Sequence, residues 1–472
     1  MKEYDSVVVG SGSGMEFVEK ALSHEETVAL IDKGPLGGTC LNLGCIPSKM
    51  LIFPADRIME IKEAKKLGIE AKITHIDFKS IMERMRTSIN DNRENMRKGV
   101  KDAPLDYYEK EAHFVDDHTL QVGKEKIKGK KIFLVSGARP FIPPIKGLEK
   151  TEYLTNESVL GLKKRPESLI IVGGGYIVAE YSHFFDAMGT KVTIVQRNER
   201  LLPDEEPEIS NMLKKQMEKR MNVHTNMEAF RVKKEEGRYR VKAKNKKTNI
   251  TREFSSEKIM IATGRKSNAE LLKVENTGVE VDERGFIKVN EKWETSKKNI
   301  WALGDAVGKS MFKHVANREA AYCSQNVFHN TNLSLDYHTV PHAVFSHPQV
   351  ASVGLKEKEA KEIYGNDVLV GGAKYSDVAK GEAMMDDCGF VKSIINKDGK
   401  ILGFHIIGPY APILIQEVVN VIAKGGNIWD ASSGMHIHPS LSEVILSGLQ
   451  PQERELLKIK FICQEQGRQS RE

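Results

Sequence analysis

Cysteine is scarce in this chain, and its scarcity excludes one class of protein. Only five cysteines occur among 472 residues, whereas small secreted domains held together by disulfides are rich in them. No stretch approaches the roughly 18 to 20 consecutive apolar residues that a membrane-spanning helix needs. The opening MKEYDSVVVGSGSG leads directly into an apolar strand, without the basic region and cleavage site of a signal peptide. We therefore expect a cytoplasmic protein with no membrane segment.

A strong excess of charge of one sign is also missing. The chain has 71 basic and 65 acidic residues, a net charge of +6. Its lysine clusters, VKKEEG and KAKNKKTN, are interleaved with acidic and polar residues, a pattern typical of solvated hairpins rather than of a nucleic-acid surface. We therefore expect no nucleic-acid partner. A chain of this length exceeds one hydrophobic core and should form two to four domains.

A glycine-rich turn lies near the amino-terminal end. The passage YDSVVVGSGSG…TVALIDKG contains an apolar strand, the glycines Gly10, Gly12 and Gly14, a helical stretch and a strand that ends at Asp32. Such glycines let the backbone approach a pyrophosphate, and an acid about 20 residues later accepts hydrogen bonds from a ribose. The passage predicts a nucleotide site, although Asp32 alone would also suit an ordinary strand end.

A second passage, SLIIVGGGYIVAEYSHFFDAMGTKVTIVQRNE, repeats this order of elements. Gly173, Gly174 and Gly175 precede a helix with apolar spacing near 3.6, and the next strand leads to Gln196 and Arg197. An acid in place of Gln196 would repel a 2′-phosphate, whereas a guanidinium can pair with one. This site therefore favours NADPH over NADH, unless Arg197 is a surface residue without a ligand.

Both passages depart from the G-x-G-x-x-G pattern at its last glycine, where Met15 and Val178 stand. That position lets helix and strand pack closely, so a larger side chain must be accommodated by a shift. One such turn would fit a structural loop equally well. Two βαβ units of about 30 residues, each with its own turn, predict two nucleotide sites.

Two of the five cysteines, Cys40 and Cys45, form a close pair in GGTCLNLGCIPSK. On a regular helix their Cα atoms would lie about 8.6 Å apart, beyond the reach of a disulfide. Gly44 and Pro47 stand where the helix can be distorted, and a bridge strained in this way should be easily reduced. A zinc site would need two further ligands, and no second Cys/His pair has metal-like spacing. The pair favours redox chemistry over a metal.

This segment resembles the redox motif of the flavin-dependent pyridine nucleotide–disulfide oxidoreductases, which include dihydrolipoamide dehydrogenase and the glutathione, mycothione and mercuric reductases. The resemblance extends from about residue 4 to residue 450. VSGARP (135–140) and IATGRKSN (261–268) resemble the family's two crossover segments. NIWALGDAV (299–307), KHVANREA (313–320) and HIHPSLSEV (436–444) resemble its ribityl-binding, flavin-contacting and His-Pro…Glu segments.

The resemblance implies an α/β fold with two Rossmann-like dinucleotide-binding domains and a C-terminal α+β dimerisation domain. It assigns residues 1–152 to an FAD-binding domain, 153–276 to an NAD(P)-binding domain, 277–345 to a central domain that completes the FAD site, and 346–472 to the interface domain. It also implies a homodimer whose active site takes its histidine from the partner chain. The tail from residue 451 is expected to be mobile or a surface helix.

The resemblance also implies a reaction. NADPH gives a hydride to FAD, which passes two electrons to the disulfide of Cys40 and Cys45. Cys45 is then the thiol beside the flavin, and Cys40 attacks the substrate disulfide. His438 would exchange the proton, oriented by Glu443; without the resemblance, the same residues would also fit a turn with a capping glutamate.

Further residues take roles by resemblance. Lys49 and Glu180 resemble the ion pair beside the flavin, and His436 is expected to be structural. The resemblance implies FAD contacts from Gly10, Gly12, Gly14, Asp32, Lys33, Gly38, Thr39, Lys49, Ala112, Ser136, Gly137, Asp305, His314, Val315 and Ala316. It implies contacts with the nicotinamide coenzyme from Gly173, Gly175, Tyr176, Ile177, Gln196, Arg197 and Gly264.

The branch of the family is a separate question. Mercuric reductases carry a C-terminal cysteine pair, whereas here only Cys463 lies in the tail, which disfavours mercury reduction. Dihydrolipoamide dehydrogenase normally has an acid where Gln196 stands. The stretches GSGSGMEF, KHVANREAAY, AVFSHPQVASVGL and YSDVAKGEAM are most similar to the mycothione reductase branch. We therefore predict an NADPH-dependent reductase of a small disulfide, with an NAD-dependent dihydrolipoamide dehydrogenase as the alternative and a flavoprotein electron carrier as a more remote one.

Overall fold

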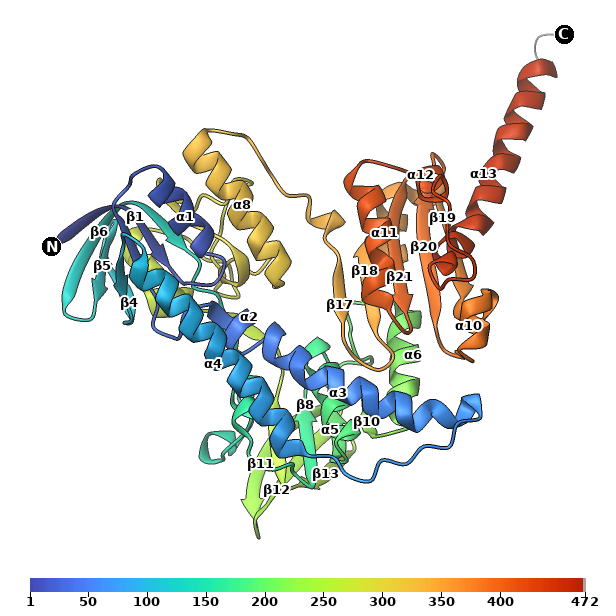
Figure 1. The fold of residues 1–472 in the computed structure, drawn as a ribbon, viewed down its shortest axis with the longest axis horizontal. Helices are drawn as coiled ribbons and strands as arrows, with labels where there is room; N and C mark the ends of the chain where they lie inside the picture. Colours follow the sequence, from blue (N-terminus) through green and yellow to red (C-terminus); the bar gives the residue numbers. More distant parts are fainter. Residues whose placement is uncertain (470–472) are drawn as a thin grey trace.

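The computed structural model describes residues 1–469, with side chains up to residue 457. Its strands form three larger sheets, which follow one another along the chain (Figure 1). None of the described helices is long and apolar enough to cross a membrane.

The first sheet contains the amino-terminal glycine-rich turn. Its strands are ordered β3-β2-β1-β6-β5-β4, with β16 paired to β6. Strands β1, β2, β3, β6 and β16 are parallel neighbours, so their carboxyl ends meet at one edge, where nucleotides bind in such sheets. The strands are β1 (Lys2–Val9), β2 (Val28–Ile31), β3 (Asp106–Tyr108), β4 (Ala112–Asp116), β5 (Thr119–Val122), β6 (Glu125–Leu134) and β16 (Ile300–Ala302). Since β16 comes from the predicted central domain, that segment completes the first sheet.

Five helices accompany this part of the chain. The helix α1 follows the glycine-rich turn and packs against α8. The long helices α3 and α4 lie against one another and extend toward the second sheet (Figure 1). The helices are α1 (Met15–Ser23), α2 (Gly38–Asn42), α3 (Cys45–Glu63), α4 (Phe78–Asp102) and α8 (Lys313–His329).

The second sheet has the parallel order β10-β9-β8-β14. Its strands are β8 (Ser168–Val172), β9 (Lys191–Val195), β10 (Asn222–His224) and β14 (Lys258–Ile261), and its helices are α5 (Tyr176–Ala187) and α6 (Pro207–Glu218). The antiparallel strands β11 (Met227–Glu235), β12 (Arg238–Asn245) and β13 (Thr251–Ser256) pack beside it. The lysine clusters lie on these strands and their turns, as predicted.

The two predicted crossover segments pair with each other. β7 (Ala138–Pro140) and β15 (Arg265–Ser267) form a two-stranded antiparallel sheet. The chain passes here from the first sheet to the second and returns to the short helix α7 (Ala269–Leu272). The two sheets are therefore connected through the paired strands β7 and β15.

The last sheet has the order β17-β18-β21-β20-β19 and is antiparallel. Its first strand, β17, begins a few residues ahead of the expected boundary at residue 346. The strands are β17 (His342–Val344), β18 (Val350–Gly354), β19 (Val368–Lys374), β20 (Phe390–Asn396) and β21 (Ile401–Ile407). The helices are α9 (Glu357–Tyr364), α10 (Ala379–Ala383), α11 (Ala411–Ala423), α12 (Ile428–Ser432) and α13 (Glu443–Gln469). The predicted tail continues α13; the side chain of Cys463 lies outside the described residues.

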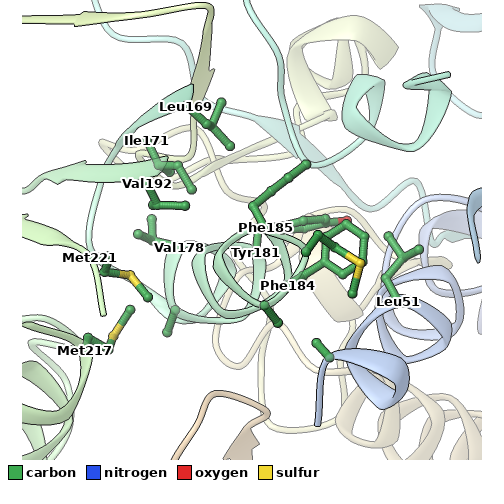
Figure 2. Close-up of a cluster of buried hydrophobic side chains, with 14 of the residues drawn as sticks. Leu51, Leu169, Ile171, Val178, Tyr181, Phe184, Phe185, Val192, Met217 and Met221 are labelled. Atoms are coloured by element: carbon green, nitrogen blue, oxygen red, sulfur yellow. The ribbon is translucent and has the colours of Figure 1, made fainter. Parts of the chain in front are cut away.

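A hydrophobic core joins α3 to the second sheet (Figure 2). Helix α5 is buried on nearly every face. Phe184 of α5 and Leu51 of α3 are each 1% exposed, and burial of such a side chain contributes about 1.5–3 kcal/mol. The redox segment at the start of α3 is therefore fixed relative to the second nucleotide turn.

Buried charges join the second sheet to the last one. Glu205, just before α6, lies 2.5 Å from His342 of β17. Lys392 of β20 lies 2.9 Å from Glu206 and 2.7 Å from Glu357. Removing one partner of a buried pair leaves an uncompensated charge, so these contacts hold the last sheet in one position.

Candidate active site

The two cysteines lie at a break between helices. Helix α2 ends at Asn42, and Gly44 has φ −131° and ψ −111°, outside helical geometry, so that α3 begins anew at Cys45. The chain is thus distorted between Cys40 and Cys45, where the sequence predicted it. The two cysteines are not joined by a disulfide in this structure.

The two sulfur atoms share one proton unequally. Cys40 donates a hydrogen bond to the sulfur of Cys45, which raises the pKa of Cys40 well above its ordinary range. The same bond, with help from the charge of Lys49, lowers the pKa of Cys45 to about 7. Since the thiolate is the reactive form, Cys45 holds the negative charge and Cys40 keeps its proton.

An ion pair stands one helical turn beyond Cys45. The ammonium group of Lys49 lies 2.8 Å from both carboxylate oxygens of Glu180, which is buried on α5. The backbone N–H of Phe345 donates to the same carboxylate at 3.1 Å, and its ring lies under the ammonium group. Three segments far apart in sequence therefore contribute to this ion pair. The structure brings Lys49 and Glu180 together, which the sequence resemblance implied.

The amino-terminal turn has the shape of a pyrophosphate cradle. Gly10 has φ +108°, and a Cβ atom there would lie 2.2 Å from the carbonyl oxygen of Val135. A Cβ atom on Gly38 would lie 2.8 Å from the Cα atom of Gly12, so α2 lies directly on the turn. Asp32 accepts hydrogen bonds from the backbone and hydroxyl groups of Ser11 at 2.8 and 2.6 Å. The residues present fit a dinucleotide.

Further groups along the same edge fit this role. Asp305 is 3.4 Å from Arg265, and burial raises the pKa of its carboxyl group. The hydroxyl oxygen of Ser136 is buried and has no hydrogen-bond partner among the described residues, as expected where a ligand supplies the partner. Gly137 has φ +68°.

The other predicted FAD residues take varied positions. Thr39 lies on α2, and His314, Val315 and Ala316 lie in the first turn of α8. Lys33 is exposed and lies 3.5 Å from Glu111. Ala112 is half-buried at the start of β4.

The second glycine-rich turn has the same geometry. Gly173 has φ +133°, and a Cβ atom there would lie 2.1 Å from the carbonyl oxygen of Ala262. The fully buried Val178 packs at 3.1 Å from the same position, so a valine fits where the pattern has its last glycine. Met15 is half-buried in the corresponding place of the first turn.

The residues beyond β9 differ in exposure. Gln196 is 4% exposed and donates a hydrogen bond to the carbonyl oxygen of Arg200 at 3.1 Å. Arg197 is exposed and, within the described chain, forms no ion pair. Tyr176 and Ile177 begin α5, and the ring of Tyr176 lies beside Phe312 with centroids 6.0 Å apart. The crossover residue Gly264 has φ +128°.

His438 and Glu443 form a separate pair. The Nδ1 atom of His438 lies 2.9 Å from Glu443, which also accepts a hydrogen bond from the backbone of Ser440. Together these bonds lower the pKa of Glu443, that from Ser440 having the larger effect. The His438 side chain is 71% exposed, and the start of α13 lies well apart from α2 (Figure 1). One chain therefore does not bring this pair to its own cysteines.

The neighbouring His436 is bound differently. Its Nε2 atom lies 2.5 Å from Glu417 of α11 and its Nδ1 atom 3.1 Å from the carbonyl oxygen of Gly434. With both ring nitrogens engaged, His436 holds the loop against α11, which agrees with the structural role expected for it.

Two cations of the site were missed in the sequence. Arg265 pairs with Asp305, and Lys313 is the first residue of α8. A signal for Lys313 was present, because the amino-terminal end of a helix carries partial positive charge and disfavours a cation. A lysine at that position is unusual, and this was the available signal.

The chain matches two family models. Residues 4–320 match the model described as pyridine nucleotide-disulphide oxidoreductase. Residues 340–447 match its dimerisation domain. The chain belongs to this family. The predicted fold, two dinucleotide-binding domains and a dimerisation domain, is confirmed.

Curated relatives of this oxidoreductase have several different activities. A mycothione reductase of Mycobacterium tuberculosis is 32% identical over 463 residues, covering 95% of this chain and 99% of the relative. A dihydrolipoyl dehydrogenase of Geobacillus stearothermophilus is 32% identical over 454 residues, covering 94% and 95%. A mercuric reductase of Lysinibacillus sphaericus is 31% identical over 445 residues, covering 93% and 81%.

A solved structure is similar over the same length. The flavoprotein disulfide reductase RclA from Escherichia coli, solved as a Cu(II) complex, has a TM-score of 0.85 and 27% sequence identity, covering 95% of this chain and 99% of its own. The protein is thus a flavin-dependent oxidoreductase that acts on sulfur groups and uses FAD with a pyridine nucleotide.

Proposed function

We propose that a homodimer of this oxidoreductase reduces a low-molecular-weight disulfide with electrons from NADPH, through Cys40 and Cys45. The observation that carries the proposal is the thiol pair at the break between α2 and α3, with the Lys49–Glu180 ion pair one helical turn beyond Cys45. Bound FAD supplies two-electron transfer between the nicotinamide and this pair.

The residues of the chain have distinct roles in this reaction. Cys45 holds the thiolate, and the ammonium group of Lys49 stabilises its charge. Cys40 attacks the substrate disulfide, but its raised pKa means that it must first lose a proton. Glu443 holds the imidazole of His438 through Nδ1, which leaves Nε2 free to take that proton and return it to the leaving thiol.

The position of His438 supports a site shared by two subunits. The pair with Glu443 is exposed and apart from the cysteines of its own chain. Large apolar side chains around it are exposed too: Met435 is fully exposed, Ile437 is 79% exposed and Ile413 is 71% exposed. Exposed apolar surface of this kind is typical of an interface, and the chain contains the family's dimerisation domain. We infer that a second copy covers this face and receives His438 at its own thiol pair.

NADPH is the favoured coenzyme because Arg197 is exposed and no carboxylate of the described residues pairs with it. The place where an acid would bind the ribose of NADH is filled by the buried Gln196. The alternative, a dihydrolipoyl dehydrogenase, has support from the relative of that name at 32% identity. That alternative requires a preference for NADH.

A substrate panel tests the proposal. The purified dimer is assayed with NADPH and with NADH against the disulfides of glutathione, coenzyme A, mycothiol and bacillithiol and against lipoamide, by loss of absorbance from the reduced coenzyme. We expect turnover of one small disulfide with NADPH preferred. Preference for NADH with lipoamide would favour the alternative, and no turnover with any disulfide would refute the proposal.

Arg197→Ala tests coenzyme recognition. We expect the KM for NADPH to rise about 10- to 100-fold with little change for NADH, because a charge-assisted hydrogen bond is worth about 1.5–3 kcal/mol. Steady-state kinetics with both coenzymes measure the effect. Arg231→Ala, which removes an exposed arginine from β11, serves as the matched control. An equal rise for both coenzymes would contradict a role in binding the 2′-phosphate.

A further inference from the structure

Lys313 lies inside the site and is not used by the mechanism above. It is the first residue of α8 and is half-buried. Its ammonium group donates a hydrogen bond to the hydroxyl group of Ser13 at 3.0 Å, and Ser13 in turn donates to Asn317 at 2.9 Å. These bonds hold the Lys313 side chain against the amino-terminal glycine-rich turn.

The same turn supports the cysteine segment. Gly38 lies so close to Gly12 that a Cβ atom on it would approach the Cα atom of Gly12 to 2.8 Å. Ser13 follows Gly12, and Cys40 follows Gly38 by two residues, so Lys313 and Cys40 are held at the two segments that meet in this contact. The charge of Lys313 accordingly interacts with both Cys40 and Cys45.

The other cations of the site each form an ion pair, whereas Lys313 interacts with Asp305 only at longer range. Lys49 is paired with Glu180 at 2.8 Å, and Arg265 with Asp305 at 3.4 Å. Lys313 makes no ion pair within 4 Å in the described part of the chain, and it adds to the positive end of α8. The ionisable groups that interact with the thiols are Lys49, Glu180, Tyr176 and Lys313, and Asp305 and Arg265 interact in turn with Tyr176.

A positive charge near the pair stabilises its reduced state more than its oxidised state. The disulfide is neutral. When two electrons and one proton reach it, the S–S bond breaks and leaves one thiol and one thiolate. The charge of Lys313 thus gains a nearby anion when the pair is reduced.

We propose that Lys313 stabilises the thiolate of the reduced Cys40–Cys45 pair and thereby raises the reduction potential of the disulfide. This inference rests on the proposed redox role of the two cysteines. Lys313 acts on the pair through its charge from α8, whereas Lys49 acts from α3. Its role is therefore electrostatic, and an arginine should preserve it.

Lys313→Met tests the charge, with Lys313→Arg as the conservative variant. Lys309→Met is the matched control, because Lys309 is an exposed lysine of the same segment. The holoenzyme is reduced by two electrons without oxygen, and the long-wavelength absorbance of the thiolate beside the flavin is titrated with pH. The reduction potential of the dithiol is measured by equilibration with a reference couple.

The expected change is a tenfold loss of thiolate stability in Lys313→Met. The titration midpoint should rise by about one pH unit, because an opposite charge favours the charged form of its neighbour. The same factor of ten lowers a two-electron potential by about 30 mV. Lys313→Arg and Lys309→Met should keep the midpoint and potential of the wild type. An unchanged midpoint and potential in Lys313→Met would overturn the inference.

Two further measurements keep the test decisive. If Lys313→Met binds FAD poorly, the pH dependence of iodoacetamide alkylation of the reduced cysteines, followed by mass spectrometry, reports the same midpoint without the flavin. Cys45→Ser in the wild-type background separates the two proposals. Persistence of the long-wavelength absorbance in that variant would refute the redox pair itself, whereas its loss together with an unchanged Lys313→Met refutes only the role of Lys313.

Discussion

Replacing Cys40 with serine should abolish disulfide reduction while the long-wavelength absorbance of the reduced enzyme persists. Cys40 is the attacking thiol of the proposed mechanism, and a serine hydroxyl cannot exchange with a disulfide. The absorbance arises from the thiolate of Cys45, which the lowered pKa of this thiol favours. Anaerobic titration with NADPH and a disulfide reduction assay measure the two effects separately.

Cys45→Ser should instead lose both the activity and the absorbance. The half-buried Cys388 is the matched control, and Cys388→Ser should retain both. Thiol alkylation should inactivate the wild-type enzyme only after NADPH has reduced the pair. Full activity in either Cys40→Ser or Cys45→Ser would show that the disulfide forms elsewhere.

His438→Ala should lower disulfide turnover by about 10² to 10⁴, the usual contribution of a general acid–base group. The loss is expected because the raised pKa of Cys40 keeps its proton in place until a base removes it. Hydride transfer needs no such base, so reduction of a dye or quinone should stay close to the wild-type rate. Parallel assays with a disulfide and a dye measure this difference.

The structure offers two controls for His438. Glu443→Gln keeps a hydrogen-bond acceptor near Nδ1 but removes its charge, so it should show the same pattern with a smaller loss. His436→Ala removes the neighbouring imidazole, which is bound to Glu417, and should spare the chemistry. Equal losses with the disulfide and the dye would contradict a proton-transfer role for His438.

Mixed dimers test whether the site is shared. Subunits with Cys40→Ser and subunits with His438→Ala are each inactive alone. After exchange, a heterodimer contains one site with both native residues and should regain up to about half of the activity per dimer. No regain after verified exchange would place both residues in one subunit.

The elements that depend on local spacing could be predicted from the sequence. The alternation of apolar strand, glycine turn and helix identified both nucleotide turns, because a βαβ unit is encoded within about 30 residues. The break between Cys40 and Cys45 followed from Gly44 and from the limits on disulfide geometry. These features required no knowledge of distant contacts.

Contacts between distant segments could not be derived in this way. Lys49 and Glu180 are 131 residues apart in sequence, and only the family resemblance suggested their pairing. The approach of Lys313 to the thiols depends on the packing of α8 against the first turn, and the contact of Lys392 with Glu206 joins two sheets. The protonation order of the cysteines depends on the direction of one hydrogen bond. Each of these facts belongs to the three-dimensional arrangement.

The position of α5 has a consequence for protein engineering. The helix begins at the second glycine-rich turn, holds Lys49 through Glu180 and contributes Phe184 to the core shared with Leu51 (Figure 2). A coenzyme-binding domain transplanted from a relative would replace α5. The relative's helix would then have to pack against α3 of this protein. Chimeras should therefore be joined so that α3 and α5 come from the same parent. The coenzyme specificity of this scaffold is better altered by point substitutions after β9 than by exchange of the whole domain.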